Sequence, residues 1–195
     1  MANINPQKIT GKWLSGFALD VHTTSSIYLG VNEAGHEIYD TKRSEIGELL
    51  YRLKYRGDMA AAGEIIDATS KFLAPHRGKF DLIVPVPPSG VRAVQPVIVV
   101  ARGIGAALDI PMIECVTTTR GAAQLKGVLD PDKRNELLAG LHAVDPAHTA
   151  GKNILLFDDL FRSGATMNAI TELLMAAGKA ASVRALTITR TRSNQ

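Results

Sequence analysis

Two adjacent acids, Asp158 and Asp159, follow directly on the apolar run Ile154-Leu155-Leu156-Phe157. Like charges side by side repel each other and are costly to desolvate, so such a pair makes physical sense beside a ligand. Carboxylate oxygens accept hydrogen bonds from a vicinal diol and also stabilise a positive charge that develops in a reaction. For the two acids alone, solvated loop residues would be the simpler interpretation.

The residues that follow the acids suit a phosphate. Gly164 allows close backbone approach, and Ser163 and Thr166 bring hydroxyl groups. The helix that is expected to begin here offers free N–H groups and the positive end of its dipole. One segment thus presents acceptors for a diol and donors for a phosphate, and ribose 5-phosphate has both. The complete pattern therefore favours a ligand site over solvated acids.

Alternating strand and helix patterns predict how these residues are held. Short apolar strands are expected at 82–86, 112–117, 153–157 and 182–189, and helices at 93–108 and 164–177. Continuous apolar strands that alternate with helices predict an α/β fold with a mainly parallel sheet covered on both faces. Ligands of such sheets bind beyond the carboxyl ends of the strands, where the acid pair lies.

The N-terminal part shows a different pattern. Residues 26–30 and 36–39 flank a turn and predict a small hairpin, so we expect residues 1–43 to form an appendage to a domain of residues 44–195. Two helices should follow. Ser44 is a candidate cap for the first, which places Ile46, Leu49, Leu50 and Leu53 on one face. Asp58 is a candidate cap for the second, which should run to about Leu73.

Composition sets outer limits on function. A chain of 195 residues with 46% hydrophobic residues can close a globular core, and its net charge of +3 suits phosphorylated small molecules and nucleic acid equally well. The single cysteine, Cys115, excludes an intramolecular disulfide and a cysteine-built zinc site. No segment has the apolar length of a signal peptide or a membrane span, so we expect a cytoplasmic protein with no membrane partner.

The segment from Ile154 to Thr166 resembles the 5-phosphoribosyl-1-pyrophosphate (PRPP) motif of type I phosphoribosyltransferases. Other segments resemble the ComF-type branch, which is related to a late competence protein. They are Leu53-Lys54-Tyr55-Arg56-Gly57-Asp58, Val84-Pro85-Val86-Pro87 with Arg92, and Thr119-Arg120 with Gln124-Leu125 and Lys133-Arg134-Asn135. Two features depart from that family: its four-cysteine zinc module is absent, and its RGFNQ sequence survives only partly at 92–95, which leaves the role of Gln95 open.

The resemblance implies roles for individual residues. Asp158 and Asp159 would bind the ribose hydroxyls and favour the positive charge at C1. Three further groups would complete the site: a 5-phosphate loop of Arg162, Ser163, Gly164, Ala165 and Thr166; a pyrophosphate loop of Pro87, Pro88, Ser89, Gly90 and Arg92; and a flexible hood with Arg120, Gln124, Lys126, Lys133, Arg134 and Asn135. For Arg162, a side chain that points to solvent is an equal alternative.

The resemblance also implies an activity. It is the magnesium-dependent transfer of ribose 5-phosphate from PRPP to a nitrogen nucleophile, or the reverse, with pyrophosphate release. Magnesium would be held mainly by the ligand and water, with Asp158 and Asp159 as candidate ligands. The expected partner is PRPP or a nucleoside monophosphate. A homodimer is possible, and nucleic acid is disfavoured without being excluded. The alternative is a non-catalytic module that senses PRPP or a nucleotide, or that serves DNA uptake.

Two further patterns resemble binding sites. Gly103-Ile104-Gly105 imitates a dinucleotide-binding turn, but Leu108 stands where a third glycine is needed, so an ordinary helix is favoured. The segment from Tyr51 to Arg56 interleaves cations with aromatics, as nucleic-acid patches do, and a solvated helix face is the favoured interpretation.

Overall fold

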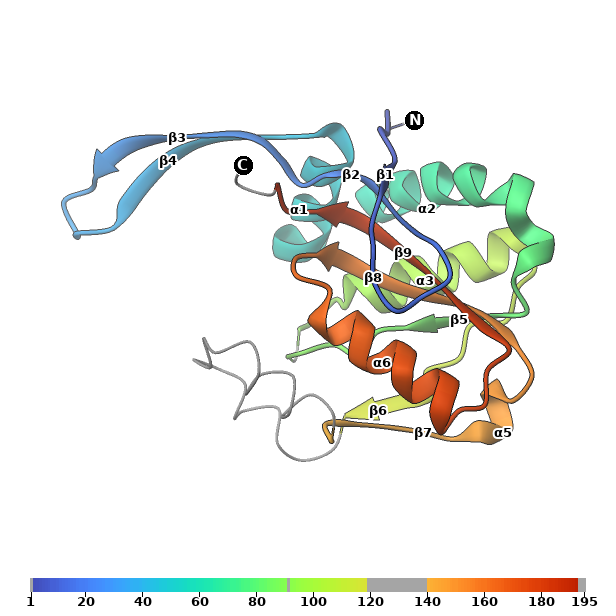
Figure 1. Ribbon diagram of the computed structural model, residues 1–195. Helices are drawn as coiled ribbons and strands as arrows, with labels where there is room; N and C mark the ends of the chain where they lie inside the picture. Colours follow the sequence, from blue (N-terminus) through green and yellow to red (C-terminus); the bar gives the residue numbers. More distant parts are fainter. Residues whose placement is uncertain (1, 91, 119–139, 193–195) are drawn as a thin grey trace.

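A five-stranded sheet forms the centre of the protein (Figure 1). The computed structural model describes residues 2–90, 92–118 and 140–192. The strand order is β1-β2-β9-β8-β5, in which β1 is antiparallel to β2 and all other neighbours are parallel. The strands are β1 (Gln7–Lys8), β2 (Gly16–Val21), β5 (Leu82–Pro85), β8 (Asn153–Phe161) and β9 (Ser182–Arg190).

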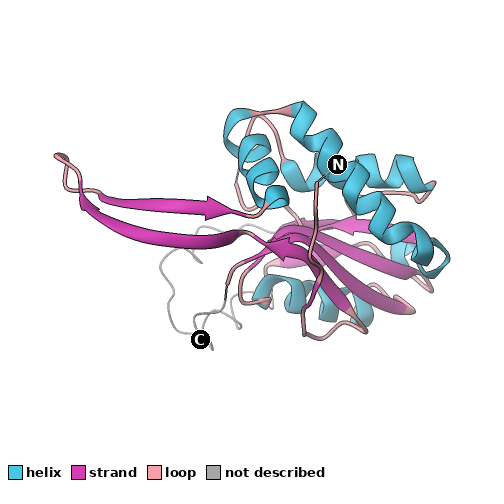
Figure 2. Ribbon diagram, turned by 90° about the horizontal axis from the view of Figure 1, so that it is seen from above, coloured by secondary structure: helices cyan, strands magenta, loops and turns pink. Residues whose placement is uncertain are grey.

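Helices cover both faces of this sheet, which confirms the predicted fold class (Figures 1 and 2). One face packs against α1 (Glu45–Arg56), α2 (Met59–Leu73) and α3 (Pro96–Leu108), and the other packs against α6 (Ala165–Ala176). Two short helices lie in the connections: η1 (Ala74–Lys79) leads from α2 to β5, and α5 (Pro146–Thr149) precedes β8. No helix among the described residues is both long and apolar enough to cross a membrane.

Strand β8 shows how the two faces are divided. Leu155 and Phe157 lie in the core that α1, α2 and α3 share, while Ile154 and Leu156 lie in the core beneath α6. Successive side chains of a strand point to opposite faces, and a central parallel strand is buried on both. The same alternation continues through Asp158 and Asp159, which lie near the end of the strand.

The first two helices begin and end where local chemistry requires. The Ser44 hydroxyl accepts a hydrogen bond from the Gly47 N–H, and the predicted apolar face of α1 is buried. Asp58 caps α2 by accepting from two amides, and its carboxylate also receives two hydrogen bonds from Arg52, at 2.9 and 2.6 Å. Gly57 joins the helices in a left-handed conformation, with φ at 65°. Both helix predictions are confirmed.

The expected strand at 112–117 differs from the observed structure. Only Met112 bridges Ile83 of β5, and the chain then leaves the sheet. Glu114 faces Arg102 of α3 at 3.4 Å, so a charged residue interrupts the apolar run. The next residues form β6 (Val116–Thr118), which pairs with β7 (His142–Val144) in a separate two-stranded sheet.

The predicted hairpin is present and longer than expected. Strands β3 (Thr23–Val31) and β4 (Glu37–Arg43) pair as an antiparallel ribbon that projects from the body (Figures 1 and 2). It joins β2, which lies beside β9 in the central sheet, to α1. A domain boundary near residue 43 stays a prediction, and the sheet contains strands from both sides of it.

Candidate functional site

Two adjoining cavities open at the carboxyl ends of the central strands. Their volumes are about 480 and about 350 Å³. Both are lined by Asp158, Leu160, Arg162 and Thr166. Strand β8 continues to Phe161, so both acids lie within the strand, where Asp158 is opposite Thr187 of β9 and Leu160 is opposite Thr189. The larger cavity takes its other walls from the start of α6, and the smaller one from the loop after β5.

The loop before α6 forms the larger cavity. All five predicted phosphate-loop residues, Arg162, Ser163, Gly164, Ala165 and Thr166, line it. Gly164 has a φ of 76°, and an added Cβ there would lie 2.8 Å from the Phe161 ring. The Ser163 hydroxyl accepts a hydrogen bond from the Ala165 N–H at 3.4 Å, next to the free N–H groups that begin α6. The glycine therefore lets the loop turn tightly around a helix N-terminus suited to an anion.

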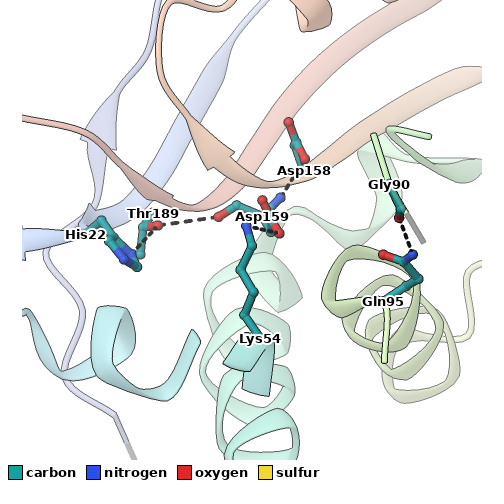
Figure 3. A network of polar contacts seen from close by, with 7 residues as sticks. All are labelled: His22, Lys54, Gly90, Gln95, Asp158, Asp159 and Thr189. Carbon is teal, nitrogen blue, oxygen red and sulfur yellow. Dashed lines mark hydrogen bonds and ion pairs between the residues drawn. The ribbon is translucent and has the colours of Figure 1, made fainter. Parts of the chain in front are cut away.

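The two acids point to opposite faces of strand β8 (Figure 3). Asp158 continues the side-chain series that faces α6 and lines both cavities, whereas Asp159 continues the series that faces α1 and lines only the smaller one. The Asp159 N–H donates to Oδ1 of Asp158 at 2.8 Å. The pleat thus separates the two charges, and each acid has its own surroundings.

Asp159 is paired with Lys54 of α1. The Lys54 ammonium donates to Oδ2 of Asp159 at 3.1 Å, and the two side chains are only 20% and 18% exposed. Behind the pair, the Thr189 hydroxyl donates to the Asp159 carbonyl at 3.4 Å and lies 3.2 Å from Nδ1 of His22 (Figure 3). Burial, followed by the positive charges of Arg43 and Lys54, lowers the pKa of His22. A neutral imidazole therefore supports the strand ends at neutral pH.

Lys54 was missed as a site residue in the sequence. The segment around it signals a family resemblance, and its place between Leu53 and Tyr55 indicates only a helix. Its proximity to Asp159 depends on how α1 crosses the sheet, which the residue order alone does not contain. The available signal for Lys54 was its position: it directly follows the buried Leu53, and the capping residues Gly57 and Asp58 come soon after it.

Asp158 has the strongly perturbed carboxyl of the site. Burial, reinforced by the negative charge of Asp159, raises the pKa of Asp158 to about 7. Its neighbour across the sheet, Thr187 of β9, is fully buried with no hydrogen-bond partner for its hydroxyl among the described residues. A carboxyl that titrates near neutrality, beside a polar group without a partner, is typical of a ligand site.

The loop after β5 supplies the wall of the smaller cavity. Its lining includes every residue predicted for pyrophosphate, namely Pro87, Pro88, Ser89, Gly90 and Arg92. Gln95 donates through Nε2 to the Gly90 carbonyl at 2.7 Å, which gives this residue a structural role in the loop (Figure 3). The Arg92 guanidinium lies 5.8 Å from the centre of the Tyr55 ring on α1. A cation and a backbone loop thus face the acid pair across the cavity.

Three predicted features have different outcomes. The hood residues Arg120, Gln124, Lys126, Lys133, Arg134 and Asn135 lie outside the described residues. Gly103 and Gly105 lie inside α3, against Ile66 and the Ile110 carbonyl, so they are helix-packing residues and do not form a dinucleotide turn. In the segment from Tyr51 to Arg56, Arg56 stacks on Tyr51, as Arg43 does from β4.

The carboxylates fit a magnesium ion only together with ligand oxygens. Among residues 2–90, 92–118 and 140–192, no cluster of three or more acidic, histidine or cysteine side chains could hold a metal by itself. Asp158 and Asp159 offer hard oxygen donors next to a cavity lined by Ser89 and Arg92. A magnesium ion here would therefore take most of its ligands from a bound pyrophosphate or ribose and from water.

Comparison with known proteins identifies a relative. No protein-family model matches the chain. The chain is 32% identical over 150 residues to the competence protein ComFC of Bacillus subtilis strain 168, a match that spans 73% of this chain and 59% of that protein. The chain thus accounts for less than two thirds of the length of this curated relative.

Solved structures with a similar arrangement include phosphoribosyltransferases. An adenine phosphoribosyltransferase from Saccharomyces cerevisiae is 16% identical, with 85% of this chain and 83% of that chain covered and a TM-score of 0.49. An orotate phosphoribosyltransferase from Aeropyrum pernix is 17% identical, with 84% and 75% covered and a TM-score of 0.47.

The strand order and the helices on both faces define an α/β protein with a mainly parallel sheet. Within that class, the sequence match to ComFC confirms the resemblance that the motifs indicated. The chain belongs to the ComF-type family.

Proposed function

We propose that the protein binds PRPP together with magnesium and transfers its ribose 5-phosphate to a nitrogen nucleophile, releasing pyrophosphate. The observation that carries this proposal is that three groups of residues line the same pair of adjoining cavities. They are the phosphate-type loop at 162–166, the acid pair, and the loop at 87–92. A ligand that carries a phosphate, a diol and a second anionic group could place these three parts against the three groups of residues in the same order.

Each group of residues has a physical task in this proposal. The backbone N–H groups around Gly164 would bind the 5-phosphate at the start of α6. Asp158 and Asp159 would accept hydrogen bonds from the ribose hydroxyls, and their ionised forms would favour the positive charge that develops at C1. The loop that ends in Gly90, with Arg92, would hold the pyrophosphate.

The bond changes are a substitution at C1. The bond from C1 to the pyrophosphate oxygen breaks and its electron pair stays on the leaving group, while the nitrogen lone pair forms the new bond to C1. The proton of the nitrogen is then lost to water or to the leaving group. When bound, magnesium would neutralise part of the pyrophosphate charge. The protein's own contribution is to orient the substrate and to stabilise charge.

Calorimetry and product release together test this proposal. PRPP should bind in the presence of magnesium, and Asp159→Asn should weaken binding, whereas Asp67→Asn on the exposed side of α2 should not. A panel of nitrogenous bases and amines should then include one that yields pyrophosphate. If PRPP does not bind, the whole proposal is wrong. If PRPP binds but no base or amine of a broad panel yields pyrophosphate, the proposed catalysis is wrong.

The second candidate is a binding module that uses the same cavities without catalysis. The name of the curated relative favours this candidate, because it describes a competence protein and names no enzyme activity. Such a module would bind PRPP or a nucleotide and act on a partner in DNA uptake. DNA association that persists in Asp158→Ala and weakens with salt would favour it.

A further inference from the structure

A small cavity lies on the sheet face that α1, α2 and α3 cover, near the amino ends of β8 and β9. Its volume is about 100 Å³. Leu155 of β8 and Leu186 of β9 line it from the sheet, and the end of α2 and the short helix η1 line it from the other side. It shares no lining residue with the two cavities at Asp158, which lies near the opposite ends of these strands. The cavity is therefore separate from the candidate site described above.

The buried part of this cavity is apolar and aromatic. Phe17 of β2 and Phe72 of α2 meet edge to face, with ring centres 5.8 Å apart, and both rings line the cavity together with Phe80. Phe17 is 38% exposed, although it lies opposite the buried Leu186 in the register of β2 and β9. An apolar cavity of roughly 150 Å³ can take up benzene, so this smaller one suits a group no larger than one ring.

Positive charge lines the exposed part of the cavity. Lys79 and His76 of η1 are exposed, Arg184 of β9 is half-buried, and all three line the cavity. No acidic residue is among the described residues that line it. Charge and apolar surface thus lie side by side, which is the arrangement that an apolar anion needs.

Arg184 is placed to bind such an anion. It lies opposite Leu155 in the register of β8 and β9, on a sheet face whose core is apolar. Its Nη1 donates only to neutral oxygens, the Ser182 hydroxyl at 3.0 Å and the Lys79 carbonyl at 3.4 Å. Its Nε and Nη2 donate to no residue within the described part of the chain. These two atoms form one side of the guanidinium fork, which matches the two oxygens of a carboxylate.

No carboxylate of the described chain supplies that partner. Neither Arg184 nor Lys79 takes part in any ion pair between described residues. Asp81 follows Lys79 closely in the sequence, but its carboxylate accepts hydrogen bonds from the backbone and the side chain of Asn153, at 2.8 and 2.9 Å. The positive charge beside the cavity is therefore available to a ligand.

We propose that this cavity is a second binding site and that it takes a small aromatic monocarboxylate. The ring would pack against Phe17 and Phe72, and the carboxylate would accept hydrogen bonds from Arg184 and Lys79. A single planar carboxylate fits one arginine fork, and one ring fills the apolar volume. The site does not depend on the binding of PRPP, because the two sites have no lining residue in common.

NMR titration with 4-fluorobenzoate tests the site. The fluorine signal should show saturable binding with a dissociation constant of about 0.1 to about 5 mM, and the backbone amides that shift should be those around Phe72, Lys79 and Leu186. Arg184→Met should raise the dissociation constant about threefold to tenfold. Lys79→Met, at an exposed position that folding does not require, should raise it about twofold. Arg102→Met is the matched control, since Arg102 is an exposed arginine on α3 that does not line the cavity, and it should have no effect.

Two further ligands separate the role of charge from that of the ring. 4-Fluorobenzyl alcohol has the same ring without the charge and should bind at least about threefold more weakly. Inorganic pyrophosphate, which has charge and no ring, should not displace 4-fluorobenzoate. The proposal is wrong if the acid and the alcohol bind equally, if the acid does not bind up to about 20 mM, or if its amide shifts are confined to residues 162–166.

Discussion

The Lys54 ammonium lies 3.1 Å from a carboxylate oxygen of Asp159, although 105 residues separate them in the sequence. The contact joins the last turn of α1 to the end of β8, and both residues line the smaller cavity. It also explains how two adjacent acids coexist: Asp159 has a cation, and Asp158, on the other face, titrates near neutrality. The two acids thus have different surroundings: Asp159 is paired with a cation, and Asp158 is the carboxyl with the raised pKa.

Lys54→Met should destabilise the fold. Removal of the ammonium leaves Asp159 without its partner and with only 18% of its side chain exposed, so the desolvated charge becomes a cost. We expect a loss of about 1–2 kcal/mol in the free energy of unfolding, measured by urea denaturation at neutral pH.

Lys71→Met is the control for this substitution. Lys71 forms an ion pair with Asp67 one turn away on α2, and both side chains are about half exposed. Exposed pairs of this kind contribute well under 1 kcal/mol. If both variants lose the same free energy of unfolding, the buried position of Lys54 does not make its ion pair more stabilising than an exposed one.

The contribution of Asp158 to stability should fall as pH rises toward neutrality. The native Asp158 keeps its proton up to about pH 7, whereas the unfolded side chain loses it near its ordinary value of 3.8. Since the native state binds more protons between these two values, the free energy of unfolding decreases with pH across that window and is level above it for this group. Asp158→Asn removes this dependence. The variant should match the wild type at pH 4 and exceed it by about 1–3 kcal/mol at pH 8.

Two measurements test the predicted pH dependence of Asp158. Thermal or urea unfolding over the pH range gives the slope, and an NMR titration of the Asp158 carboxyl gives the pKa directly. Asp67→Asn, at an exposed position, should show no such gain at pH 8. A wild-type protein whose stability rises steadily from pH 4 to pH 8, with Asp158→Asn parallel to it, would contradict the raised pKa.

Much of the fold could be predicted because its strands are short apolar runs and its helices carry recognisable caps. Ser44 and Asp58 cap the helices that they were expected to cap, and the loop at 162–166 begins a helix as expected. Strand β2 was missed, since Gly16–Val21 contains both a glycine and an aspartate and resembles turn-rich sequence. Its pairing with β9, far along the chain, determines its conformation.

In the candidate site, too, some residues could be predicted from the sequence and others could not. The acids and both loops are contiguous motifs, so residue order was sufficient to nominate them. Lys54 is held against Asp159 by packing between α1 and the sheet, and the opposite directions of the two acids follow from the pleat of β8. Long-range packing of this kind leaves no local pattern in the sequence.

Gln95→Leu should weaken ligand binding and leave the fold intact. The Gln95 amide donates to the Gly90 carbonyl at 2.7 Å and so holds the loop that we assign to pyrophosphate. Without it, the loop gains freedom that binding must then remove, and we expect a roughly three- to tenfold loss of affinity for pyrophosphate by calorimetry.

Gln95→Glu provides the control for charge. Its carboxylate cannot donate to the carbonyl and adds a negative charge beside the anion, so affinity should fall further than in Gln95→Leu. Affinity that both variants leave unchanged would show that the loop is held without this hydrogen bond.

Gly164→Ala should damage the phosphate-type loop. Gly164 has a φ of 76°, which is unfavourable for any side chain, and an added Cβ would also lie 2.8 Å from the Phe161 ring. We expect a loss of about 1–3 kcal/mol in the free energy of unfolding, together with weaker binding of inorganic phosphate. Gly63→Ala is the matched control, because Gly63 lies inside α2 with open space around its Cα, and alanine there should stabilise the helix by about 0.5–1 kcal/mol. Urea denaturation gives both values, and a neutral Gly164→Ala would mean that the loop adopts another conformation in solution.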